Sequence, residues 1–238
     1  MPEHCHRVIL KLSGELFGEN GNNHIDFDKY DLVARKLITI QTESSAQIAI
    51  VVGGGNIFRG REANSKVDHT EADSMGMMAT VINGIGLREA LLRNGATDTR
   101  LMTALNLPEV AEPYIKHKGL HHLENGRMVI IAGGLGRPNF STDSAVAQYA
   151  DELRCRLVLK ASTVDGVYDQ DPRKYPQAVK YKELSFQTAL DKKLAVMDLT
   201  AFTMCLRSQI PIFVFNIKDL HRIPQVINGD YSFGTIIK

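Results

Sequence analysis

The stretch Val51-Val-Gly-Gly-Gly-Asn-Ile-Phe-Arg-Gly-Arg61 decides how the rest of the chain is interpreted. The apolar, β-branched run from Ile48 to Val52 predicts a buried strand, and three consecutive glycines end it. Because glycine has no Cβ, such a turn can bring backbone N–H groups close to a ligand. Amides followed by Arg59 and Arg61 are groups that phosphate oxygens favour. A tight strand–helix turn with surface arginines would give the same pattern, so the other strand ends must decide between the two interpretations.

Strand and helix patterns alternate through the first two thirds of the chain. Strands are predicted at residues 7–12, 47–52, 99–105, 127–132 and 157–161. Helices are predicted at 26–40, at 70–94 after a polar loop at 62–69, in a short segment opening at Pro108, and at 143–153. This alternation predicts an α/β fold, a three-layer α/β/α sandwich with a central, mainly parallel sheet.

Ligands of such sheets bind beyond the carboxyl ends of the strands. The loops after the first, second, fourth and fifth predicted strands are the ones rich in Gly, Ser, Thr, Lys and Asp. We therefore expect these four loops to form one site.

The last third of the chain begins near Ser162 and continues the same fold. Asp165-Gly166 and Asp171-Pro172 indicate turns. Helices are predicted at 185–190, 198–207 and 223–227, and strands at 210–215 and 234–237. Because no linker, repeat or low-complexity segment interrupts the 238 residues, we expect a single domain, 1–238, in which lobes 1–161 and 162–238 share one sheet.

Composition excludes several classes of function. A net charge of +1 without a basic tract gives no indication of nucleic-acid binding. No run approaches the roughly 18 apolar residues of a membrane span, and the N-terminus has no signal-peptide pattern, so a cytoplasmic protein is expected. Cys5, Cys155 and Cys205 are odd in number and far apart, which is not a disulfide framework.

The familiar nucleotide and hydrolase motifs are also missing. The chain has no G-x-x-x-x-G-K-[ST] and no G-x-S-x-G. Both G-x-G segments lack the third glycine of the dinucleotide fingerprint, since Phe58 and Asn139 occupy its place. A P-loop, a Rossmann NAD site and a nucleophile elbow are therefore not predicted.

Isolated lysines and carboxylates at strand ends remain as candidates for chemistry. Lys11 and Lys160 each lie inside an apolar strand, where lysine is seldom buried without a partner. An outward-facing lysine on a half-exposed strand would explain Lys11 alone. Two such lysines on opposite sides of a site could neutralise a phosphoryl group during transfer. Asp143 and Asp198 precede helical patterns, where they could cap a helix or hold a lysine in place.

The order and spacing of seven motifs resemble the bacterial UMP kinases of the amino-acid kinase superfamily, and the resemblance spans Arg7 to Ile237. The motifs are Lys11-Leu-Ser-Gly-Glu15, Gly53-Gly-Gly-Asn-Ile-Phe-Arg-Gly60, Ala72-Asp-Ser-Met-Gly-Met77, Ser141-Thr-Asp143, Leu159-Lys-Ala-Ser-Thr-Val-Asp-Gly-Val-Tyr168, Asp171-Pro172 and Val196-Met-Asp-Leu-Thr-Ala-Phe202. Each motif is weak alone, and their combination is specific.

This resemblance implies the amino-acid kinase fold and transfer of the ATP γ-phosphoryl group to UMP, with Mg²⁺ held mainly by the nucleotide phosphates and no metal ligand from the protein. The implied catalytic residues are Lys11, Lys160, Asp143 and Asp198. The implied ATP-binding residues are Lys11, Ser13, Gly14, Gly55, Arg59, Ser162, Thr163, Tyr168 and Asp171. The implied UMP-binding residues are Gly54, Arg59, Asp73, Gly76, Leu135, Gly136, Arg137, Pro138, Asn139, Phe140, Ser141 and Thr142. Lobe 1–161 would mainly bind the nucleoside monophosphate, and lobe 162–238 mainly ATP.

The chain departs from the family pattern in the monophosphate loop. Most relatives have Gly-Thr-Gly-Asn-Pro, where this chain has Gly134-Leu-Gly-Arg-Pro138. Leu135 lacks a hydroxyl and Arg137 adds a charge, so side-chain contacts to the base are expected to differ. Ser162 also stands where lysine or asparagine is common. The family further implies a homohexamer and the effectors GTP and UTP. The Met-rich helix after Ala72 could make subunit contacts or simply pack in the core.

Two other functions fit parts of the pattern. A relative that phosphorylates a carboxylate, such as acetylglutamate or aspartate, would use the same lysines and glycines. Such a substrate has no ribose diol for Asp73 to bind, which argues against this alternative. A nucleotide-binding protein without turnover would not need Lys11, Lys160, Asp143 and Asp198 together. ADP formation with a panel of acceptors distinguishes the three.

Overall fold

A single nine-stranded sheet forms the centre of the part of the chain that the computed structural model describes, residues 7–18, 25–60, 66–194 and 196–238. Arg61, Cys5 and most of the loop predicted at 62–69 lie outside the described residues. From edge to edge the strands are β4 (Glu112–Pro113), β3 (Arg100–Thr103), β5 (Val129–Ala132), β2 (Gln47–Val52), β1 (Arg7–Leu12), β6 (Leu157–Ser162), β10 (Ile212–Asn216), β11 (Thr235–Ile237) and β9 (Glu183–Leu184).

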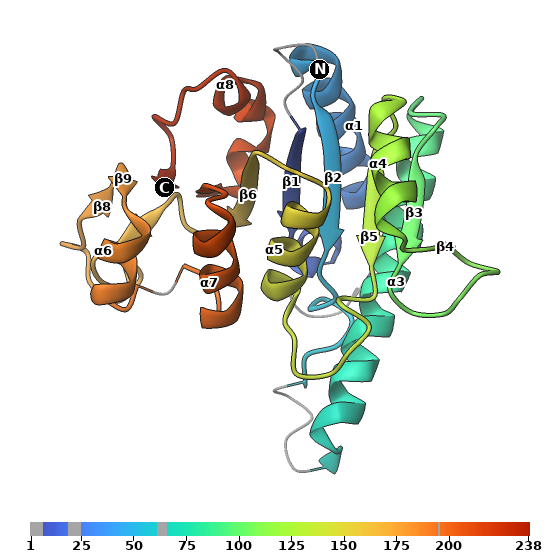
Figure 1. Ribbon diagram of the computed structural model, residues 1–238, viewed down its shortest axis with the longest axis horizontal. Helices are drawn as coiled ribbons and strands as arrows, with labels where there is room; N and C mark the ends of the chain where they lie inside the picture. Colours follow the sequence, from blue (N-terminus) through green and yellow to red (C-terminus); the bar gives the residue numbers. More distant parts are fainter. Residues whose placement is uncertain (1–6, 19–24, 61–65, 195) are drawn as a thin grey trace.

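The expected mainly parallel sheet is confirmed. Neighbouring strands run parallel except β10 and β11, which are antiparallel. Strands β5, β2, β1 and β6 are direct neighbours in the centre of the sheet (Figure 1). The loops after these four strands are the ones that the sequence predicts to share a site, and the topology therefore brings them to one edge of the sheet.

Helices cover both faces of the sheet and complete three layers (Figure 1). One face is covered by η1 (Gly14–Phe17), α1 (Phe27–Ser44), α3 (His69–Arg93), η3 (Ile217–Arg222) and α8 (Ile223–Ile227). The other is covered by α4 (Lys116–Glu124), α5 (Thr142–Glu152), α6 (Phe186–Asp191) and α7 (Leu199–Ser208). None of the helices in the described ranges combines the length and apolarity needed to cross a bilayer.

Alternation along the central strands decides which side chains face which layer. In β1, Leu10 and Leu12 pack with the core under α1 and α3, whereas Ile9 packs with the core under α5 and α7. Successive side chains of a strand point to opposite faces, so Lys11 points to the same layer as Ile9. Lys160 of β6 follows the same rule, since Val158 belongs to the core under α5 and α7.

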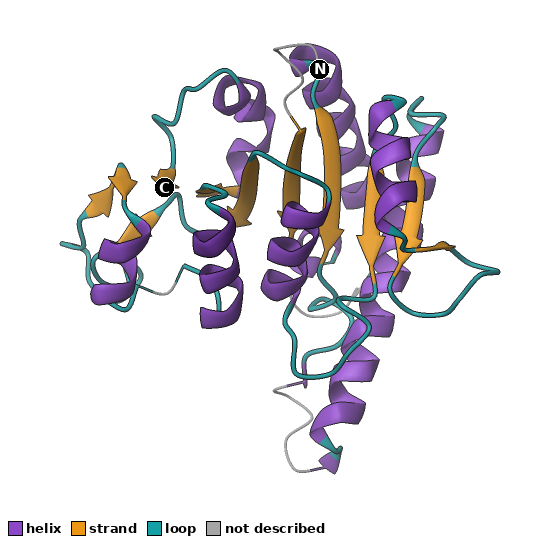
Figure 2. Cartoon of the chain, in the orientation of Figure 1, coloured by secondary structure: helices purple, strands orange, loops and turns teal. Residues whose placement is uncertain are grey.

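Side-chain caps start the helices that border the loops. Asp26 and Asp68 accept hydrogen bonds from the first N–H groups of α1 and α3, and Ser141 and Asp198 do so for α5 and α7. Gly95, with φ of 104°, follows α3 as the sequence predicts. The N-terminal half of α3 extends past the ends of the strands, and the loops after the strands gather beside it (Figure 2).

The sequence-based expectation is wrong in the segment after β3. Residues 108–110 form a turn rather than a helix, with the N–H groups of Val110 and Ala111 bonded to Leu107 O. The helix of this region is α4, which begins at Lys116 without a side-chain cap. The two-residue strands β4, β7 (Val167–Tyr168), β8 (Lys180–Tyr181) and β9 are also absent from the expectation, because two residues give no periodicity to recognise.

Candidate functional site

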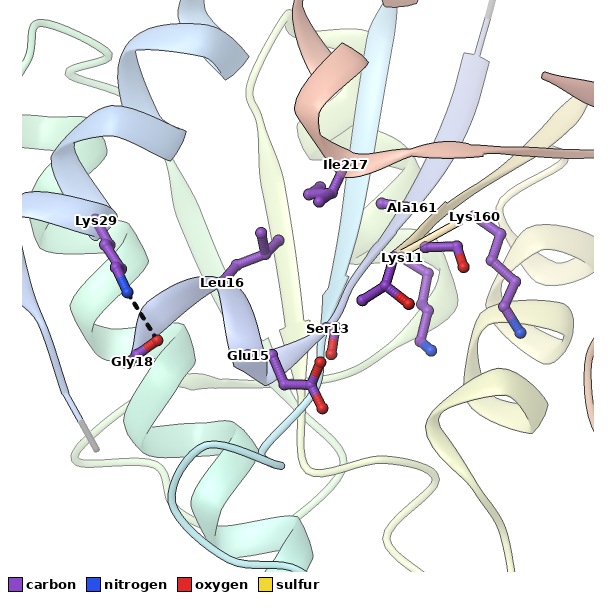
Figure 3. Close-up of a pocket in the computed structure, with 11 residues that line it drawn as sticks. Lys11, Ser13, Glu15, Leu16, Gly18, Lys29, Lys160, Ala161 and Ile217 are labelled. Carbon is purple, nitrogen blue, oxygen red and sulfur yellow. Dashed lines mark hydrogen bonds between the residues drawn. The ribbon is translucent and has the colours of Figure 1, made fainter. Parts of the chain in front are cut away.

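Lys11 and Lys160 lie side by side on neighbouring strands. Their Cα positions are partners in the parallel register of β1 and β6, and Figure 3 shows both side chains pointing the same way. The carboxylate of Asp143, in the first turn of α5, contacts both: Oδ1 is 3.2 Å from Lys11 Nζ and Oδ2 is 2.7 Å from Lys160 Nζ. Lys160 Nζ also donates a hydrogen bond to Val196 O. The two lysines thus reach a ligand from the same side rather than from opposite sides.

Burial makes the charges of this cluster depend on each other. The three side chains expose only 14–18 % of their surface. Burial raises the pKa of Asp143, but the ammonium groups of Lys11 and Lys160 outweigh it and hold this pKa below its ordinary value. Burial lowers the pKa of Lys160, and Asp143 opposes that shift. Two ammonium groups therefore share one carboxylate, and a phosphoryl group would supply the anion that the ion-paired cluster lacks.

Asp198 contacts serines rather than either lysine. It accepts hydrogen bonds from Ser141 Oγ, from Ser144 Oγ at 3.2 Å and from Ala201 N at 2.9 Å. Its charge partly offsets, from a distance, the lowering of the Lys160 pKa that burial causes. Asp198 consequently joins the N-terminus of α7 to the first turn of α5, which is the turn that carries Asp143.

The glycines of the β2 turn serve two different purposes. A Cβ at Gly53 would lie 3.0 Å from Gly14 N, and one at Gly54 would lie 2.7 Å from Ala79 Cβ in α3. Gly53 and Gly54 are thus required for packing against the chain itself. A Cβ at Gly55 would meet nothing within 4 Å, and among the described residues the N–H of Gly55 has no acceptor. The N–H of Gly54 likewise has no acceptor among the described residues, whereas Gly53 N donates to Leu12 O, so the amides of Gly54 and Gly55 are both available to a ligand.

A cavity of about 460 Å³ lies beyond the end of β2, and we call it the β2 cavity. Seven of the residues predicted to bind UMP line it: Gly54, Arg59, Asp73, Gly76, Phe140, Ser141 and Thr142. Gly55, which is predicted to bind ATP, lines it as well. The predicted residues that do not line it are Leu135, Gly136, Arg137, Pro138 and Asn139. These five belong to a loop whose backbone is shaped by positive φ angles at Gly133, Gly134, Gly136 and Asn139.

Arg59 and Asp73 are both anchored to backbone at the border of this cavity. Arg59 Nε donates to Gly55 O at 2.8 Å, and its terminal nitrogen lies 2.7 Å from Glu15 Oε1. Asp73 Oδ2 accepts a hydrogen bond from Asn139 N at 2.6 Å. The guanidinium group is thereby aimed along the glycine turn, and Asp73 ties α3 to the loop at residues 133–141.

Two further cavities flank β6. The β1 cavity, about 430 Å³, includes Lys11, Ser13, Lys160, Ser162 and Thr163 (Figure 3). The β6 cavity, about 420 Å³, includes Lys160, Ser162, Tyr168 and Asp171. Lys160 and Ser162 belong to both. Gly14 lines none of the three cavities, because a Cβ there would lie 2.6 Å from Gly55 N and the two turns are in contact.

Hydrogen bonds within the loop after β6 shape the β6 cavity. Tyr168 OH donates to Asp165 Oδ1 at 2.6 Å, and this bond, with burial, raises the pKa of Tyr168 to about 12. Lys180 Nζ lies 3.0 Å from Asp165 Oδ2. Asp171 Oδ1 accepts from Arg173 N at 3.0 Å and closes a turn. Tyr168, Asp165 and Asp171 thus each have a hydrogen-bond partner within this segment.

Comparison with known proteins agrees with this geometry. The model of the amino acid kinase family matches residues 6–216. The chain belongs to the amino acid kinase family. A protein of Corynebacterium efficiens named uridylate kinase is 43% identical over 233 residues, which are 98% of this chain and 94% of that protein.

Solved crystal structures extend the likeness to three dimensions. UMP kinase from Ureaplasma parvum has a TM-score of 0.91 at 34% identity, with 98% of this chain and 99% of that chain covered. UMP kinase from Bacillus anthracis has a TM-score of 0.93 at 34% identity, with 98% and 95% covered. Uridylate kinase from Archaeoglobus fulgidus, with a TM-score of 0.74 at 24% identity, shares the fold.

The two carboxylates nearest the lysines, Asp143 and Asp198, already have partners within the chain. Mg²⁺ commonly takes one or two carboxylates together with waters and phosphate oxygens. Asp143 is paired with two lysines and Asp198 accepts three hydrogen bonds. Among the described residues no three His, Cys, Asp or Glu side chains form a group that could hold a metal.

Several residues at the site are not predictable from motifs. Glu15 holds Arg59, Val196 contributes a carbonyl to Lys160, and Lys192 and Lys193 line the β6 cavity. Glu15 stands inside the motif Lys11-Leu-Ser-Gly-Glu15, but only the structure shows that it lies beside Arg59. A backbone carbonyl such as that of Val196 leaves no signal in the sequence.

Proposed function

We propose that this protein transfers the γ-phosphoryl group of ATP to UMP, giving UDP and ADP. The observation that carries the proposal is the pair Lys11 and Lys160, fixed in register on adjacent strands and joined by Asp143. Lys160 lines both the β1 and β6 cavities, and the β1 cavity shares Glu15 with the β2 cavity. Relatives named uridylate kinase and UMP kinase support the choice of acceptor.

The reaction needs charge stabilisation more than covalent help from the protein. An oxygen of the UMP phosphate forms a bond to the γ-phosphorus of ATP while the bond from that phosphorus to the β–γ bridging oxygen breaks, and ADP leaves with the electron pair. Lys11 and Lys160 would face the charge on the moving group, and Gly55 N–H would donate to it. When Mg²⁺ is bound, it neutralises part of the phosphate charge.

The cavities suggest where each nucleotide binds. We propose UMP in the β2 cavity, with Arg59 on its phosphate and Asp73 on its ribose hydroxyls, and ATP along the β6 and β1 cavities past Ser162. Lobe 1–161 would then mainly bind UMP and lobe 162–238 mainly ATP. The side chains of Leu135 and Arg137 would contribute little, because they do not line the β2 cavity.

Acceptor specificity tests the proposal directly. The protein is incubated with Mg-ATP and UMP, CMP, acetylglutamate or aspartate, and ADP is measured. ADP formed with UMP supports the proposed reaction. ADP formed with acetylglutamate or aspartate but not with UMP would identify a carboxylate kinase, and saturable ATP binding without ADP would identify a binding protein. Either result would refute the proposal.

We also propose a homohexamer responsive to GTP and UTP, which the family resemblance suggests. Met75, Met78 and Ile82 of α3 are exposed in the single chain, and a subunit contact would bury them. Light scattering after size-exclusion chromatography measures the mass, with a single-chain mass of 26.4 kDa as the reference. Initial rates with and without GTP or UTP test the effectors.

A further inference from the structure

We propose that Asn83 is a positioning residue for phosphoryl transfer, because it holds together the two turns that follow β1 and β2. The inference rests on the proposed function for its kinetic test. It concerns a residue in the middle of α3 that lines none of the three cavities.

Asn83 is a fully buried amide with its hydrogen-bonding groups satisfied. Its exposed fraction is 0%. Its Nδ2 donates to Gly53 O at 2.6 Å and to Asn56 Oδ1 at 2.7 Å, and its Oδ1 accepts from Tyr30 OH at 2.6 Å. Burying an amide is unfavourable unless it is hydrogen-bonded, so a helix that only filled the core would have an apolar residue at this position.

The partners of Asn83 bracket the part of the glycine turn that faces a ligand. Gly53 precedes Gly54 and Gly55, and Asn56 follows them. By holding both ends of this segment, the amide of Asn83 fixes the direction of the Gly55 N–H, which borders the β2 cavity. The segment is also bonded to β1, because Gly53 N donates to Leu12 O at the end of that strand.

Asn56 extends the same network to the turn after β1. A Cβ at Gly14 would lie 2.5 Å from Asn56 Oδ1 and 2.6 Å from Gly55 N, so the amide of Asn56 fills the space between the two turns. The turn that contains Gly14 follows directly on Lys11 and Ser13. The positions of Lys11 and of the Gly55 amide relative to each other are thus linked through Asn56 to Asn83.

Asn83 also has one partner that lies away from the site. Tyr30 comes from α1, is buried, and stacks on Phe17 with ring centroids 4.5 Å apart. Its hydroxyl donates to Asn83 Oδ1, which also accepts from Asn56 Nδ2 at 3.3 Å. Tyr30→Phe therefore removes a hydrogen bond of Asn83 without removing either contact to the turns, and it serves as the matched control.

The experiment compares Asn83→Ala, Asn56→Ala and Tyr30→Phe with the wild-type chain. Displacing reacting groups by about 1 Å can cost roughly 10²-fold in rate. We expect kcat per folded molecule to fall roughly 10- to 100-fold in Asn83→Ala and Asn56→Ala, with KM changed less than kcat. Tyr30→Phe should lower the melting temperature and leave kcat within about twofold of wild type.

Unchanged kcat in both Asn83→Ala and Asn56→Ala would overturn the inference, as would a loss of kcat in all three variants that follows their melting temperatures. If Asn83→Ala does not fold, Asn56→Ala decides, because Asn56 is only partly buried and lies in the turn.

A wild-type chain that forms no ADP would refute the proposed function and would leave the inference testable by structure. Crystal structures of the three variants then give the readout. A Gly55 amide displaced by about 1 Å in Asn83→Ala and Asn56→Ala but not in Tyr30→Phe would support a positioning role, and an unchanged position in all three would overturn it.

Discussion

Replacing Asp143 by asparagine removes the carboxylate that Lys11 and Lys160 share and keeps its shape. At 3.2 and 2.7 Å, with an effective dielectric constant of about 20, the two attractions amount to about 5 and about 6 kcal/mol before desolvation is subtracted. Breaking a buried ion pair by removing one partner costs about 3–5 kcal/mol. Because these side chains retain 14–18 % exposure, we expect the lower end, about 3 kcal/mol.

For a chain of this size, 1 kcal/mol corresponds to about 2–4 °C in melting temperature. Asp143→Asn should therefore melt about 6–12 °C below wild type when no nucleotide is present. Scanning calorimetry measures this difference. Asp151→Asn is the matched control, since Asp151 is an exposed carboxylate of the same helix and should shift the melting temperature little. A shift for Asp143→Asn no larger than that of the control would refute the reasoning.

The same ion pairs give a pH dependence of defined sign. The pKa of Asp143 in the folded chain lies below its ordinary value of 3.8. The stabilisation by its carboxylate is therefore fully present above about pH 4 and is lost as the pH falls through the lowered pKa. The difference in stability between wild type and Asp143→Asn should be constant from pH 5 to 7 and should shrink below pH 4. A difference that grows on acidification would contradict the assignment.

Three further changes are predicted from the site. Lys11→Ala should lower kcat by roughly 10²–10³-fold, because one preorganised cation is lost, and initial rates with saturating ATP and UMP within a few-fold of wild type would exclude that role. Gly54→Ala should destabilise the fold by about 1–3 kcal/mol, since its Cβ would collide with α3, whereas Gly55→Ala should not; equal denaturation midpoints would contradict this. Ser144→Ala should cost about 1 kcal/mol through the lost bond to Asp198, which urea unfolding measures.

Strong periodicity and clear caps made most of the fold predictable. Residues 7–12 and 47–52 are apolar runs that end in turn residues, and the structure confirms both as β1 and β2. The helix assigned to Pro108 failed, since a proline that suits a helix start also suits the turn at 108–110. The helix that the structure has in this region, α4, begins at Lys116 without a side-chain cap, so no local signal marks its start.

The part of the candidate site that was predictable consists of charged side chains at the ends of apolar strands. Lys11, Lys160 and Asp143 lie together. The two lysines lie side by side rather than on opposite sides as expected, because the sequence does not show that β1 and β6 are neighbours. The packing role of Gly54 was not predictable, because it depends on how closely α3 approaches the turn. Asn83 was missed for a related reason: a single asparagine in an apolar helix does not show which distant groups it will bond.

The register of β1 and β6 has a consequence for how this architecture can diversify. The separation of the two ammonium-bearing residues is set by interstrand hydrogen bonding, at roughly 4.8 Å between neighbouring strands. Loops that determine which ligand binds can therefore change in length or sequence while the distance between the two strands stays constant. A one-residue shift in the register of β1 and β6 would point one lysine toward the opposite layer. The register of these two strands, rather than the length of any loop, is therefore the feature least free to vary.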